Sequence, residues 1–208
     1  GLVAILFMKL LFASGKFAAG TRLKPLQLGL TAAVICGVVA MFVPEVMGLG
    51  VETIDVILDN GYLLNFLLIL LVLKLSVTSL AIGFGLFGGV FSPALFIGAA
   101  AGGFVANAIS IFGLAVAPQL FVVAGMAAVA AAVVGAPVAV VLIVLEFTMS
   151  YEFAVAAMLS VVMATLLSSL LYGHSFFDEQ LSRRGIDLSQ GRGNLELMNQ
   201  PITSVVND

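Results

Sequence analysis

Residues 88–93, near the middle of the chain, have the pattern of an anion site built from backbone groups. Gly88 and Gly89 allow a sharp turn, and Pro93 fits the first helical turn, where its missing N–H is harmless. The N–H groups of Val90 and Phe91 are then free at a helix N-terminus, which has about half a positive charge. Such an end binds anions without a basic side chain. The same pattern is also typical of a glycine-rich hinge before a transmembrane helix.

One helix N-terminus is too weak to hold a small anion inside a membrane. Moving a small ion into a medium of low dielectric costs on the order of 20 kcal/mol, whereas one helix dipole contributes about 1–2 kcal/mol. Several helix ends, hydroxyl groups and residual water must therefore converge on the ion. A site without a full basic charge also favours conduction, because a conducted ion must be able to leave.

The composition predicts that these residues belong to an integral membrane protein. Of the 208 residues, 62% are hydrophobic and only 9% are Asp, Glu, Lys or Arg, and the mean hydropathy is +1.24. A soluble globule of this size has too little polar surface to cover so much apolar area. The composition therefore excludes a soluble enzyme domain and a disordered chain. The net charge of −3 argues against a nucleic-acid partner.

The apolar runs predict an all-α fold of tilted and broken helices in a lipid bilayer. A short helix is expected in the polar connection 45–60, a loop begins at Lys16, and longer helices are expected over 1–15, 27–43, 62–82, 90–112, 119–134, 137–149 and 152–172. Glycine and proline interrupt these runs, and broken helices persist in hydrocarbon only inside protein or beside a water-filled cavity. Discontinuous helices are typical of transporters and channels. Lys and Arg flank both ends of the chain, so they leave its orientation open.

Small residues at helical spacing predict a tight bundle. Gly98 and Gly102 form a GxxxG pattern, and the run 124–137 consists almost entirely of Ala, Gly and Val. Small side chains at this spacing let two helices approach closely in a membrane. These positions therefore indicate packing rather than ligand binding.

Few side chains suggest chemistry of another kind. Cys36 is expected to be a small buried hydrophobe, and His174 a solvated side chain at the membrane boundary. Lys74 is expected to extend towards an interface. Glu146 is expected to cap a helix or to pair inside the bundle, with a role in transport as the alternative. We therefore expect no catalytic residue, no metal site and no cofactor.

Five motifs in order between residues 44 and 187 resemble the CLC family of chloride channels and chloride/proton exchangers. The family's GxFxP signature is matched by Gly89 to Pro93, and the other four matches are 44–50 (PEVMGLG), 124–137 (AGMAA with GAP), 144–148 (VLEFT) and 183–187 (RRGID). Five ordered motifs are far more specific than the signature alone. The last one is similar to prokaryotic members that continue into CBS domains.

The resemblance implies a fold of two inverted halves in each subunit and a homodimer with one pore in each subunit. This chain would supply the C-terminal membrane half, 1–177, and a cytoplasmic tail, 178–208, that leads towards a CBS domain. Its partners would be the chloride ion, the missing N-terminal half of the same protein, a second subunit and the lipid bilayer. We expect the inner (plasma) membrane of a prokaryote, with a cytoplasmic C-terminus.

The resemblance also implies an anion-binding site that comprises Gly89, Val90, Phe91, Ser92, Pro93 and Phe177. The amides of Val90 and Phe91 would contact chloride, and the flanking glycine and proline would shape the helix start. Phe177 stands where the family uses a tyrosine hydroxyl, so the site would lack one donor. The family's gating and proton glutamates fall outside this chain, so channel and exchanger remain alternatives.

Two further classes of function are alternatives on the residues alone. One is a different inverted-repeat secondary transporter that binds another small solute between broken helices. The other is an intramembrane hydrolase, which would need His174 inside the bundle; its polar neighbours oppose this. The prediction is therefore transmembrane transport of chloride or a similar small anion, by a voltage-gated-type channel or an antiporter rather than an enzyme.

Overall fold

A computed structural model describes residues 1–114 and 116–183 and confirms the all-α prediction for them. Five helices are long and apolar enough to cross a membrane: α1, α2, α4, α5 and the helix that begins at Tyr151. The elements are α1 (Leu2–Gly20), α2 (Pro25–Phe42), the 3-10 helix η1 (Pro44–Val46), α3 (Val51–Leu58), α4 (Leu64–Gly83), α5 (Phe91–Ile111), α6 (Pro118–Val134), α7 (Pro137–Thr148), α8 (Tyr151–Leu171) and α9 (Phe176–Ser182). Most of the expected tail, 184–208, lies outside the described residues.

The expected helices agree with these bounds to within a few residues, with one exception at the N-terminus. The loop expected from Lys16 is wrong, because α1 continues to Gly20. Lys16 is exposed, and lysine is a good helix former, so the charge does not end the helix. The chain turns only at Thr21, before Pro25 opens α2.

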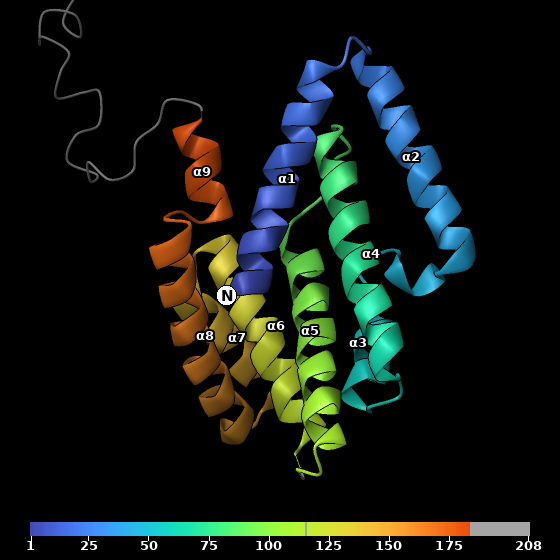
Figure 1. The fold of residues 1–208 in the computed structure, drawn as a ribbon. Coiled ribbons are helices and arrows are strands. Elements are labelled where there is room, and N and C mark those ends of the chain that lie inside the picture. Colours follow the sequence, from blue (N-terminus) through green and yellow to red (C-terminus); the bar gives the residue numbers. More distant parts are fainter. Residues whose placement is uncertain (115, 184–208) are drawn as a thin grey trace, which may run out of the picture.

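The broken character of the fold is visible where α5 begins (Figure 1). Helix α4 runs to one end of the bundle, and the chain then turns back, so that α5 starts part way along α4. Gly85, with φ +89°, has a backbone conformation in this return that favours glycine. A second break separates α6 from α7, where Gly135 ends one helix in the left-handed region and Pro137 opens the next. The start of α5 therefore lies inside the bundle.

The tight packing predicted from the small residues is confirmed between α5 and α6. A Cβ on Gly98 would overlap the carbonyl oxygen of Gly125, and one on Gly102 would overlap that of Phe121. The two backbones are thus in direct contact, which leaves no room for a side chain. Ala127, Ala130 and neighbouring residues of α6 are buried in the same core. This contact packs α5 directly against α6.

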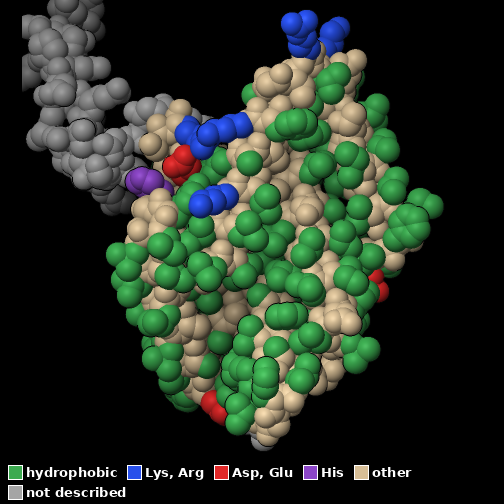
Figure 2. Space-filling model, in the orientation of Figure 1, with side chains coloured by type: hydrophobic (Ala, Val, Ile, Leu, Met, Phe, Trp, Pro, Cys, Tyr) green, Lys and Arg blue, Asp and Glu red, His purple; other side chains and the backbone are tan. Residues whose placement is uncertain are grey.

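The face seen in Figure 2 is largely apolar along the bundle, and the basic side chains on it gather towards one end. The loop between α1 and α2, which contains Arg22 and Lys24, lies at that end, and α9 lies beside α1 on the same side. Arg183 on α9 stacks over the Phe12 ring of α1, 4.3 Å from its centre. Basic residues that flank opposite ends of the sequence therefore lie towards the same end of the molecule.

Candidate anion site

The helix start predicted at residues 90–93 is present and carries unbonded amides. Val90 is the N-cap of α5, and the first backbone bond of the helix runs from the Ala94 N–H to the Val90 carbonyl, at 3.1 Å. In the described part of the chain, no N–H from Phe87 to Ser92 donates a hydrogen bond. A helix start leaves its first N–H groups without an acceptor inside the helix, and the N–H groups of the preceding loop are unbonded as well. They provide a run of electropositive backbone atoms that extends from the exposed residues 87–89 to the buried Val90.

A cavity of about 490 Å³ lies beside this helix start. Gly89, Ser92 and Pro93 of the predicted site line it, with Thr78 of α4 and Cys36 of α2. Val90 is buried among the core residues, and Phe91 is half-buried and packs against that core. The predicted residues 89–93 therefore lie together at one helix start, with one edge on a cavity. Cys36 is half-exposed rather than buried, which corrects the expectation for this thiol.

Lys74, which lines the same cavity, was missed as a site residue. Its side chain is only 2% exposed, and Nζ donates to the carbonyl oxygens of Val46 at 2.7 Å and Gly48 at 3.0 Å. The expectation that Lys74 extends to an interface is wrong, because these carbonyls replace water around the ammonium. The sequence contained one indication that Lys74 is unusual: it is followed by 71 uncharged residues before the next charged residue, Glu146.

The turn between η1 and α3, residues 47–50, connects Lys74 to the start of α5. Ser92 Oγ in the first turn of α5 donates to the Leu49 carbonyl, at 3.1 Å. Gly50 has φ +76°, and a Cβ there would overlap the buried Phe96 ring of α5. The turn is therefore held against α5 at two neighbouring residues.

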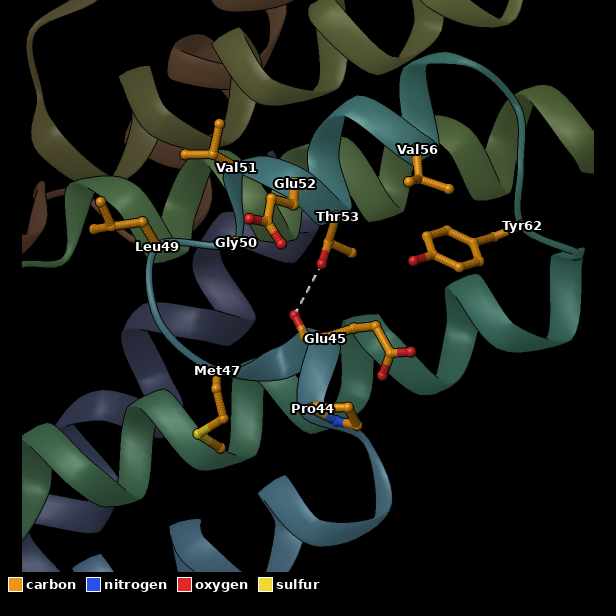
Figure 3. A pocket seen from close by; sticks show the side chains of 10 residues that line it. All are labelled: Pro44, Glu45, Met47, Leu49, Gly50, Val51, Glu52, Thr53, Val56 and Tyr62. Atoms are coloured by element: carbon orange, nitrogen blue, oxygen red, sulfur yellow. Dashed lines mark hydrogen bonds between the residues drawn. The ribbon is translucent and has the colours of Figure 1, made fainter.

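A second cavity, of about 650 Å³, lies on another side of this turn and is acidic (Figure 3). The Glu45 and Glu52 carboxylates and the Tyr62 phenol line it. Thr53 Oγ1 donates to the Glu45 carbonyl at 3.2 Å, which ties α3 to η1. Burial, and next the Glu45 carboxylate, raise the pKa of the Tyr62 phenol above its ordinary value. The phenol therefore stays protonated at neutral pH.

Phe177 lies in the first turn of α9, a separate element from the start of α5. Its side chain is 44% exposed, and its ring meets the Phe176 ring edge-on, with centres 5.4 Å apart. Phe176 stacks on Phe12 of α1 and shares a buried core with Val90. Phe176 thus connects Phe177 to the core around the start of α5. The role of Phe177 towards the anion remains a prediction.

Two other polar residues lie away from the cavity beside α5. Glu146, in the last turn of α7, is exposed and forms no hydrogen bond or ion pair within the described residues, so the expected internal pairing is wrong. His174 is exposed, as expected, and lines a cavity of about 180 Å³ at the end of α6. Neither residue contributes to the cluster of free amides.

Comparison with known proteins identifies related sequences. The H(+)/Cl(-) exchange transporter ClcA of Vibrio cholerae is 32% identical over 171 residues, which are 81% of this chain and 36% of that protein. The transporter of the same name from Vibrio campbellii is 31% identical over 189 residues, 88% of this chain and 40% of that protein. The chain thus spans roughly two fifths of the length of these relatives.

The sequence model of a family described as voltage gated chloride channel matches residues 1–169. The match contains the broken helices, the start of α5 and the turn that Lys74 holds. It covers most of the 208 residues. This chain therefore belongs to the voltage gated chloride channel family.

Proposed function

We propose that the full-length protein transports chloride, or a similar small inorganic anion, across a membrane. The observation that carries the proposal is the row of unbonded N–H groups from Phe87 to Ser92 beside a cavity of about 490 Å³. Backbone donors fixed at a helix start attract an anion yet bind it loosely enough for release. Relatives named H(+)/Cl(-) exchange transporters favour proton-coupled antiport over a channel.

The rest of the protein would complete the site. One helix N-terminus offsets only a small part of the dehydration free energy of an anion. Relatives more than twice as long as the matched segment contain sequence that could supply the missing donors. We therefore include an N-terminal half and a second, identical subunit as proposed partners. Phe177 would contribute an apolar wall where a hydroxyl is absent.

The charge distribution supports an orientation in the membrane. Basic side chains gather towards the end where the loop between α1 and α2 lies, with α9 on the same side. Lys and Arg near the ends of membrane helices favour the cytoplasmic side. The proposed location is the inner membrane of a bacterium, with α9 and the C-terminus in the cytoplasm. Accessibility of Arg183 to a protease added from either side tests this orientation.

Ion fluxes in liposomes test the function directly. The full-length protein, reconstituted into chloride-loaded vesicles, is expected to release chloride, in contrast to protein-free vesicles. Proton movement against its own gradient, driven by chloride, would identify an antiporter, and chloride flux without proton movement a channel. Vesicles that retain their chloride would contradict the proposed function.

The contribution of the backbone amides is tested at Val90. Val90→Pro removes one N–H, and the native φ of −88° lies near the range that proline adopts. Loss of a hydrogen bond to a charged ligand is worth about 1.5–3 kcal/mol, so chloride affinity is expected to fall by about tenfold or more. Val90→Ala, which keeps the N–H and removes more of the buried side chain than proline does, is the control for lost packing. Equal affinities of the two variants, measured by calorimetric titration, would exclude an amide ligand at this position.

A further inference from the structure

Lys74 is a buried cation without an acidic partner in the described chain. The single ion pair found among residues 1–114 and 116–183 joins Arg183 to Glu179, far along the sequence. The Lys74 ammonium instead contacts two carbonyl oxygens and lies over the Phe96 ring, 4.6 Å from its centre. Carbonyls and an aromatic ring stabilise the ammonium but do not cancel its charge. The cavity that Lys74 lines therefore retains a net positive charge from this side chain.

The contacts of Lys74 lead to the start of α5 by two routes. In the first, the ammonium holds the Val46 and Gly48 carbonyls, and the adjacent Leu49 carbonyl accepts the Ser92 hydroxyl. In the second, the ammonium lies against the same Phe96 ring that packs on Gly50. The ammonium thus adds to the two direct contacts that hold the turn against α5.

We propose that Lys74 is a positioning residue of the anion site, which holds the turn against the start of α5 and gives the cavity a fixed positive charge. The inference rests on the proposed function and adds a determinant of anion preference to it. An ammonium bonded to two carbonyls and covered by a ring has its donors engaged, so it acts on an anion through its field. A fixed charge at a distance favours anions over cations and still permits release.

The sign of the cavity potential is measurable at Cys36, the only cysteine in this chain, which lines the cavity with Lys74. Two thiosulfonate reagents of similar size, one bearing a sulfonate and one a quaternary ammonium, are compared in the full-length protein. The rate at which each reagent modifies Cys36 is divided by its rate with a small free thiol. The Cys36→Ser variant gives the background rate of modification elsewhere in the protein. We expect the anionic reagent to be favoured by about tenfold, the order of magnitude of one unit charge in a low-dielectric site.

Three variants separate charge from packing. Lys74→Met keeps the length of the side chain and removes the charge. The preference for the anionic reagent is expected to disappear, and the chloride affinity is expected to fall by about tenfold. Lys74→Arg keeps the charge and is expected to retain the preference and most of the affinity. Ser92→Ala removes the bond to Leu49 without a change of charge, so it should weaken chloride binding while the reagent preference persists.

The outcomes distinguish this inference from the proposed function. Equal or cation-favouring rates at Cys36 in the unmodified protein, or no reaction with either reagent, overturn the electropositive cavity even if no variant folds. Loss of the preference in Lys74→Arg overturns the role of the charge. Unchanged chloride affinity in Lys74→Met overturns the inference and leaves the proposed function intact. A reagent preference in a protein that binds no chloride supports the charge and rejects the proposed function.

Discussion

Two cavities border the same turn, and they differ in the sign of their charge. The cavity beside α5 contains Lys74 and free amides, whereas the cavity beside α3 contains Glu45 and Glu52. Met47 and Leu49 line both. On one side Lys74 and Ser92 donate to carbonyls of the turn, at Gly48 and Leu49, and on the other Thr53 joins the two helices that flank the turn, α3 and η1.

The difference shows how an apolar chain with few charged residues can place opposite charges in two neighbouring cavities. Only 9% of the residues are charged, yet a short turn separates a basic cavity from an acidic one. Backbone groups contribute to this separation: the carbonyls of Val46 and Gly48 accept from the ammonium, and residues with unbonded N–H groups, Gly88, Gly89 and Ser92, line the same cavity. Disturbing the turn should therefore affect both cavities, whereas a change in one cavity should leave the other intact.

The largest effect is expected from Gly50→Ala, which disturbs the turn itself. The new Cβ would overlap the buried Phe96 ring, in addition to the strain of φ +76°. The free energy of unfolding in detergent is expected to fall by about 2–4 kcal/mol. Gly48→Ala is the matched control, because Gly48 has φ +61° but nothing within 4 Å of the new Cβ. Gly48→Ala should lower the free energy of unfolding by about 1 kcal/mol. Equal losses of stability in the two variants would show that the contact with Phe96 is unimportant.

An intermediate effect is expected from Phe177→Tyr, which tests the predicted place of Phe177 at the anion site. In the predicted site the added hydroxyl would donate to the anion, and such a bond is worth about 1.5–3 kcal/mol. Calorimetric titration of the full-length protein should give a chloride affinity higher by about tenfold or more. Phe112→Tyr, an exposed change at the far end of α5, should leave the affinity unchanged. Unchanged or weaker binding in Phe177→Tyr would contradict the assignment of Phe177.

The smallest effect is expected in the acidic cavity, from Glu45→Gln. Burial is the first cause of the raised pKa of Tyr62 and the Glu45 carboxylate the second, so the pKa should fall but stay above its ordinary value. The neutral phenol is favoured in the folded state, so its stabilisation is present below pH ~10 and is lost as pH rises through the raised pKa. Phenolate absorbance, compared with Tyr62→Phe, measures the shift. A rise in the pKa of Tyr62 would refute the effect of Glu45.

The helices and their breaks could be predicted well from the sequence. Gly135 followed by Pro137 separates α6 from α7, and the glycines before Pro93 precede α5, because these residues act on the backbone within a few positions. The close contact at Gly98 was also predictable, since only small residues allow it. These features depend on local sterics or on a simple spacing.

The candidate site was predictable only in part. Residues 89–93 lie together because they are consecutive, but the buried position of Lys74 depends on carbonyls 28 and 26 residues earlier in the chain. No local pattern distinguishes a lysine that extends to an interface from one that finds such carbonyls. The expectation for Glu146 failed similarly, because the exposure of one helix face depends on which helices pack against it.

Apolar composition and the placement of glycine and proline were enough to predict a membrane protein with an interrupted helix whose first amides are free, since both act through the chain's immediate surroundings. The packing of distant segments decided which carbonyls surround Lys74 and placed basic residues from both ends of the sequence towards the same end of the bundle. A buried charge is stabilised only by the polar groups that the fold brings to it, so its partners are a property of the tertiary structure.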